Sequence, residues 1–216
     1  MRRLRLCTVI FSLLFAFVMV LGSTFAWFTE SDQVINQLRT WPTEFHVKAL
    51  DVFDKIPVGI GTYSKRVGAV NLDNRPAFAR LLVSAVFVID SPAGGPPIVM
   101  HATIGPPGSG TMVIMADFNA SDWKDGGDGY FYYLRVLHAL ESTDTGWNTG
   151  NDRNLFNTVT MGTLPAGYEN ARLVIEVACE AVGVTPPGEY INGWWHGVTP
   201  AANPLLAVHT ALQNAK

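Results

Sequence analysis

Apolar and polar side chains alternate along several short segments of the chain, which is the pattern of β-strands. In residues 171–181, Leu173, Ile175, Val177 and Cys179 fall on one face and charged side chains fall on the other. This spacing predicts a strand with one face in the core and one in water. On this count the Cys179 side chain points inward, as a small buried hydrophobic group rather than a reactive thiol.

Residues 78–90 alternate in the same way, with Arg80 and Asp90 near the two ends, as expected of a central strand. Clusters of Gly, Pro, Asp and Ser separate further candidate strands, predicted at 45–53, 98–104, 111–118, 130–138 and 155–161. No regular alternation of strands with helices occurs. The pattern therefore predicts an all-β fold, an antiparallel β-sandwich of about seven strands.

Residues 203–216 predict one short C-terminal helix, with Asn203 as the N-cap and Pro204 as the first helical residue. The preceding stretch, 185–200, is predicted to be irregular. The apolar face of the helix is expected to consist of Leu205, Leu206, Val208, His209 and Leu212.

The N-terminus predicts an export signal. Three arginines in the first five residues precede an uncharged span of 24 residues, 6–29, whose most apolar part is 6–21. Thr24 and Ala26 then supply the small side chains that a signal peptidase needs at −3 and −1. We expect a helical signal peptide at 1–26, cut between Ala26 and Trp27. An uncleaved anchor stays open, because the span is long enough to cross a bilayer.

Length and charge narrow the classes of partner. Residues 27–216 are enough for a single domain, and they contain only Cys179, so no internal disulfide is expected. Loss of the leader would remove three of the 15 Lys and Arg residues and none of the 18 Asp and Glu residues, so the net charge falls from −3 to about −6. Such a surface disfavours nucleic acid, and membrane contact is expected only through an uncleaved leader.

Signals for catalysis are weak, and we expect neither an enzyme nor a cofactor. The five histidines are scattered without a zinc motif, and no nucleophile elbow of the GxSxG type occurs. Asp122, Asp125 and Asp128 could wrap a calcium ion, although they lack the spacing of an EF-hand loop. Aspartates and glycines that form tight turns are the favoured interpretation.

Aromatic residues gather at 130–133 (YFYY) and at Trp194 and Trp195. On an exposed face they could bind a sugar, whereas in a strand such residues more often form cross-strand core pairs. A sugar-binding face and a set of core pairs therefore both stay open.

Five stretches, in order, resemble the TasA/camelysin family, which Gram-positive bacteria export through a SipW-type signal peptidase. They are the leader junction LGSTFAWFTESD (21–32), NLDNRPAFAR (71–80), DGGDGYFYYLRVL (125–137) with Trp123 before it, VIEVACEAV (174–182) and GWWHGVTP (193–200). Cys179, Gly183 and Ala79 depart from the residues usual in the family.

The resemblance implies a jelly-roll β-sandwich, secreted to the extracellular matrix or cell surface, that builds biofilm-matrix fibres. It implies that cleavage frees an N-terminal assembly strand, 27–42, which adds to the next subunit with Trp27, Phe28, Val34 and Leu38 as anchors. The implied partners are further copies of the chain, the SipW-type peptidase and accessory matrix proteins. The family also implies one alternative, a camelysin-like metallopeptidase, and a secreted sugar-binding or adhesive β-sandwich is another.

Overall fold

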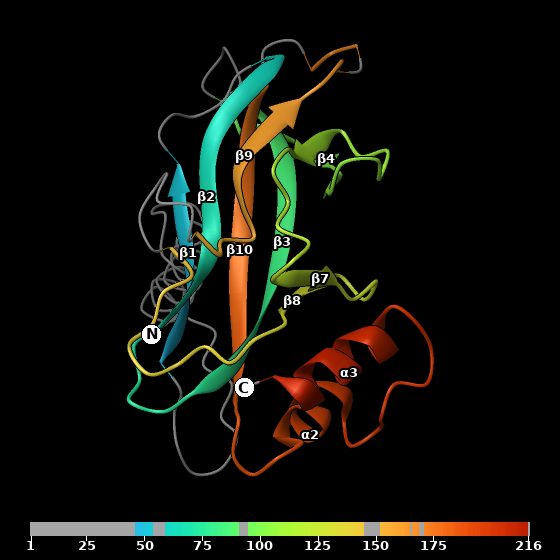
Figure 1. Ribbon diagram of the computed structural model, residues 1–216. Helices are drawn as coiled ribbons and strands as arrows, with labels where there is room; N and C mark the ends of the chain where they lie inside the picture. The colour runs from blue at the N-terminus through green and yellow to red at the C-terminus, as the bar shows by residue number, and fades with distance from the viewer. Residues whose placement is uncertain are drawn as a thin grey trace, which may run out of the picture. The chain divides into compact units, whose positions relative to one another are not determined.

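The structure is a computed structural model that describes residues 46–53, 59–90, 95–144, 152–164, 166–168 and 171–215, all within one compact unit. These residues form two β-sheets and two short helices near the C-terminus (Figure 1), which confirms the all-β prediction. The expected signal peptide 1–26 and its junction at Ala26 and Trp27 lie outside the described residues. The expected assembly strand 27–42, with Phe28, Val34 and Leu38, also lies outside them.

The first sheet, sheet A, has five strands. Neighbouring strands in it are antiparallel, except for the last pair, which is parallel. Their order is β1 (Val47–Phe53), β2 (Gly61–Asn71), β9 (Phe156–Met161), β6 (Val113–Met115) and β5 (Ile104–Gly105).

The second sheet, sheet B, is antiparallel throughout. Its order is β10 (Arg172–Gly183), β3 (Ala77–Ile89), β8 (Tyr130–Tyr133) and β7 (Trp123–Asp125), and β4 (Ile98–Ala102) also pairs with β3.

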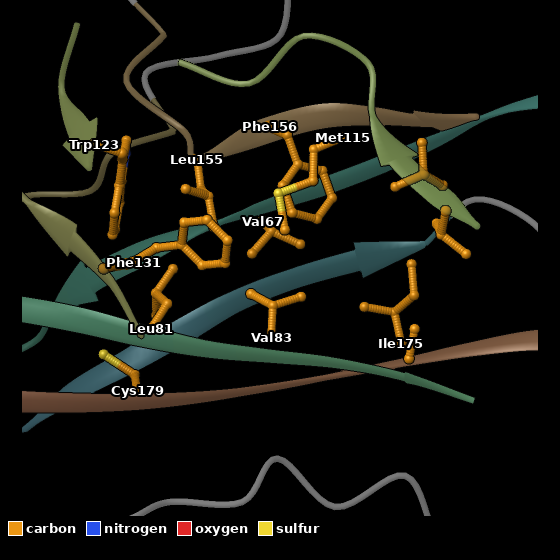
Figure 2. Close-up of a cluster of buried hydrophobic side chains, with 14 of the residues drawn as sticks. Val67, Leu81, Val83, Met115, Trp123, Phe131, Leu155, Phe156, Ile175 and Cys179 are labelled. Atoms are coloured by element: carbon orange, nitrogen blue, oxygen red, sulfur yellow. The ribbon is translucent and has the colours of Figure 1, made fainter. Parts of the chain in front are cut away.

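The two sheets share one hydrophobic core. Val67 and Phe156 of sheet A face Leu81 and Phe131 of sheet B (Figure 2), and all four are buried. Complete burial of an aliphatic or aromatic side chain of this kind stabilises a fold by about 2 kcal/mol. The predicted inward face of β10 is confirmed, and Cys179 is part of this core, where burial raises the pKa of its thiol to about 12.

A second, smaller core lies on the outer face of sheet B. Helices α2 (Glu189–Trp195) and α3 (Leu205–Asn214) cover Phe78 of β3 and Val182 of β10 there, as Figure 1 shows at one end of the sheet. The C-terminal helix is thus confirmed, although Pro204 rather than Asn203 is its N-cap. The prediction that 185–200 is irregular is wrong, because it contains α2.

Two corrections concern the face and length of predicted elements. On α3, Val208, His209 and Leu212 are buried, but Leu206 is exposed because its spacing of two residues from Val208 places it on another side of the helix. The segment predicted as one strand at 98–104 is divided, because the chain crosses at Thr103 from sheet B, where β4 pairs, to sheet A, where β5 pairs.

Several other boundaries also differ. The strands predicted at 111–118 and 130–138 shorten to β6 and β8, since the chain leaves each sheet early, and 45–53 and 155–161 correspond to β1 and β9. Strand β2 was not predicted. It carries Lys65 at a core-facing position and has a bulge relative to β9 between Ser64 and Val67, and both features interrupt a simple alternation of apolar and polar side chains.

Two loop features hold the sheets in place. Gly68 of β2 lets the two segments that carry Thr143 and Asn154 lie directly against it, and the Thr143 hydroxyl donates to Asn154 Oδ1 over 2.9 Å. At the β2–β3 turn, the buried Asn71 amide donates to the carbonyl oxygens of Arg75 (2.8 Å) and His138 (3.0 Å).

We expect Gly68→Ala to destabilise the fold by about 2 kcal/mol, because the added Cβ would overlap Thr143 Oγ1 and Asn154 Oδ1. Urea unfolding measures this. Gly162→Ala is the matched control, since a Cβ there meets nothing within 4 Å. Equal stability of the two variants would contradict this account of the crossing.

Acid should weaken the β2–β3 turn. The hydrogen bond that Arg75 donates to Asp73 lowers the pKa of Asp73 to about 2. An unfolded Asp titrates near pH 3.9, so between about pH 4 and pH 2 the unfolded chain binds a proton that the folded chain does not. The stabilisation by Asp73 is therefore present above pH 4 and lost as the pH falls toward 2. Asp73→Asn should thus be less stable than the unmodified chain at pH 6, with a smaller deficit at pH 3, when both are unfolded in urea. A deficit that stays constant would contradict the linkage.

Candidate assembly edge

The edges of the two sheets are where a further strand could pair. Within the described residues, β10 pairs only with β3 and β1 pairs only with β2. The other edge strands, β5, β7 and β4, have only two, three and five residues. Strand addition needs a row of unpaired backbone groups, so β1, with seven residues, and β10, with twelve, are the candidates.

The core is incompletely covered along β1 and β10, which lie next to one another. Ala49 and Phe53 of β1, and Val177 and Ala181 of β10, pack against the main core but are only partly buried. We call these four residues the β1/β10 edge. A strand with apolar side chains at alternate positions would cover them, as strand addition requires.

An inward-pointing charge pair protects the β1 side of this edge. The Lys65 ammonium forms an ion pair with Asp51 of β1 and lies 4.5 Å from the centre of the Phe53 ring. Lys65 is only 1% exposed, and burial lowers its pKa, while the hydrogen bond and charge of Asp51 act in the opposite direction. A charged group beside an edge strand is one means by which proteins resist pairing with another chain, and among the described residues β10 is the longer of the two edges and has no such pair.

The outer face of β10 is held by a second charged group. Arg80 Nη2 and Nε donate to Glu180 Oε2 over 2.6 and 2.8 Å, and the Tyr130 hydroxyl donates to Glu180 Oε1 over 2.8 Å. The guanidinium carbon lies 3.8 Å from the centre of the Tyr130 ring. Burial raises the pKa of Tyr130, and its hydrogen bond to Glu180 adds to this. Arg80 and Glu180 thus link β10 to β3, and the Arg80 guanidinium carbon also lies 5.2 Å from the centre of the Trp194 ring of α2.

The three predicted metal candidates have separate partners. Asp122 forms an ion pair with Arg135, and Asp125 Oδ1 accepts a hydrogen bond from the Gly127 N–H over 2.8 Å. Asp128 Oδ2 accepts from the Tyr132 hydroxyl over 2.6 Å. Among the residues that the structure describes, no group of three His, Cys, Asp or Glu side chains is placed to hold a metal ion. These aspartates serve turns and local contacts here.

The aromatic residues considered for sugar binding pack mainly in the interior. Tyr132, Tyr133 and Trp194 are buried, and the Tyr132 and Trp194 rings meet edge to face with centroids 5.5 Å apart. Burial, followed by the hydrogen bond to Asp128, raises the pKa of Tyr132 to about 12. These three rings therefore do not form an exposed platform.

Sequence reasoning identified neither the long edge strands nor the buried charge pair beside β1. An edge depends on the order of strands in a sheet, which the alternation of side chains does not give. The signal for the Asp51–Lys65 pair was a lysine at a core-facing position of β2, which could be read only after β2 itself was recognised.

Comparisons with protein-family models, with curated proteins and with solved structures find no match to this chain. None of the helices in the part of the chain that the structure describes has the length and apolar character needed to cross a membrane.

We expect Arg80→Met to destabilise the chain by about 3 kcal/mol, because it leaves the Glu180 carboxylate largely buried without its cation. The double variant Arg80→Met/Glu180→Met should recover a large part of that loss, as measured by urea unfolding. The matched control is Arg172→Met, which breaks an ion pair to the exposed Asp90 and should cost less than about 1 kcal/mol. A double variant no more stable than Arg80→Met would contradict this interpretation.

Proposed function

We propose that this chain is a secreted structural subunit of an extracellular or biofilm-matrix fibre, built on a jelly-roll arrangement of its two sheets. The TasA/camelysin-like stretches, above all the leader junction at 21–32, support export and assembly. The connectivity supports the jelly roll. Strands β1 and β2 belong to sheet A, β3 and β4 to sheet B, β5 and β6 to sheet A, and β7 and β8 to sheet B. Repeated crossing from one sheet to the other is typical of Greek-key and jelly-roll folds.

In this proposal, cleavage between Ala26 and Trp27 by a SipW-type peptidase releases the assembly strand 27–42. The strand leaves its own subunit and pairs with β10 of the next, where backbone hydrogen bonds provide affinity. Such a contact does not close on itself, so it propagates as a filament. Since the uncleaved leader would prevent release, processing controls assembly.

The lengths and the side-chain pattern are compatible with this pairing. Trp27 to Leu38 is twelve residues, and β10 is also twelve residues long. Phe28, Val34 and Leu38 are separated by even numbers of residues, so an extended strand presents all three on one face, with Glu30, Asp32 and Asn36 at the positions between them. The three apolar side chains are the ones that would contact the core side chains of the β1/β10 edge.

The partial exposure of those core side chains is the observation that carries the proposal. Val177 and Ala181 face the main core from an edge strand whose second side has no partner within the described residues. The alternatives, a camelysin-like metallopeptidase and a sugar-binding or adhesive domain, have no comparable observation in their favour in the described part of the chain. We therefore propose no enzymatic activity and no cofactor.

The proposal predicts that purified residues 27–216 form filaments, whereas residues 43–216 remain monomeric although folded. Negative-stain electron microscopy and circular dichroism measure the two properties. A peptide of residues 27–42 should bind residues 43–216 and, in excess, shorten the filaments of the longer chain.

The matched control is the same peptide with Ser in place of Phe28, Val34 and Leu38, which should bind at least tenfold more weakly. Filaments of equal length from both chains, or equal binding of both peptides, would overturn strand addition by residues 27–42.

A further inference from the structure

Two leucines are exposed at the end of the domain where the described chain begins. Leu72 is 49% exposed and Leu140 is 75% exposed, and we call the pair the proximal patch. The Leu72 N–H donates to the His46 carbonyl over 2.7 Å, and the Leu140 N–H donates to the Asp73 carbonyl over 3.1 Å. The proximal patch therefore lies beside His46, from which the N-terminal part of the chain continues.

The proximal patch is mounted on a fixed frame. The buried Asn71 side chain joins the two segments that carry the leucines, because its amide donates to Arg75 on one side and to Leu137 and His138 on the other. Leu140 also has a left-handed backbone conformation, with φ of 58°, which is rare for a leucine. The two leucine side chains are thus held in water on a backbone that hydrogen bonds fix in place.

The opposite end of the domain carries a second exposed apolar group. Ile60, Ile98 and Val99 are each more than half exposed, and we call them the distal patch. Ile60 immediately precedes β2, and Ile98 and Val99 pair with the last residues of β3. The chain turns from β2 into β3 at the proximal end. The start of β2 and the end of β3 therefore both lie at the far end, where Figure 1 shows β4.

The proposed function limits how far the next subunit can be from the proximal patch, and the inference rests on it. If the strand pairs through Leu38, eight residue steps remain to His46, and they span at most about 28 Å. A twelve-residue strand such as β10 is about 40 Å long. The tether is shorter than the domain, so the next copy must be close to the proximal end.

The direction of pairing selects which end of the next copy is close. If the strand enters at the Arg172 end of β10, it runs antiparallel to β10, whereas entry at the Gly183 end makes it parallel. Antiparallel pairing is the more stable of the two and matches the rest of sheet B. The Arg172 end is also the distal end, because Arg172 pairs with Val88 near the end of β3.

We propose that the proximal patch of one copy packs against the distal patch of the next, as a second contact between subunits besides the added strand. The contact joins different surfaces of the two copies and does not close, so it repeats along a filament. It also gives a role to the exposed apolar side chains that lie at both ends of the two sheets.

The experiment compares residues 27–216 with the variant Leu72→Ser/Leu140→Ser. We expect the critical concentration for filaments, measured by sedimentation, to rise at least tenfold while the thermal unfolding temperature stays unchanged. Ile60→Ser/Ile98→Ser/Val99→Ser should have the same effect. The matched control is Leu82→Ser, which replaces an exposed leucine near the middle of β3, between the two ends, and should change the critical concentration less than twofold.

Peptide binding separates this contact from strand addition. Residues 43–216 with Leu72→Ser/Leu140→Ser should bind the 27–42 peptide as tightly as the unmodified chain does. An unchanged critical concentration in the full-length variant, with peptide binding intact, would overturn the end contact alone. Absence of filaments from the unmodified chain, or of peptide binding, would overturn the proposed function and this contact with it.

Discussion

The pairing of β3 with β10 is the interaction on which the rest of the structure depends. Its register joins twelve residue pairs, from Arg172 opposite Val88 to Gly183 opposite Ala77. One face of the pair supplies the sheet B side of the main core, and the other places Arg80 opposite Glu180 beneath the helices. A slip by one residue would exchange the two faces, so packing on both sides fixes the register. Among the described residues, the second side of β10 has no paired strand.

The sequence predicted these two strands well because their alternation follows from packing on opposite faces. Leu173, Ile175 and Cys179 are buried as their spacing required, and the C-terminal helix lies close to its predicted position. Such elements are long, and each apolar position is reinforced by its neighbours two residues away.

The missed elements depend on contacts that are distant in sequence. Lys65 is buried because Asp51 and Phe53 of a neighbouring strand accommodate it, and no pattern within β2 reveals that. Helix α2 has seven residues, too few to be stable alone, and Tyr190 and Trp194 hold it against sheet B. The anchors of the assembly strand come from a resemblance and lie outside the described residues, whereas the edge position of β10 follows from the order of strands.

The central claim is that β10, rather than β1, accepts the strand 27–42. Amide hydrogen exchange of residues 43–216, with and without the 27–42 peptide, tests it most directly. The account predicts new protection at amides of β10 that do not pair with β3, and little change in β1, whose Asp51–Lys65 pair resists a new neighbour. Protection confined to β1, or peptide binding without any change in β10, would contradict it.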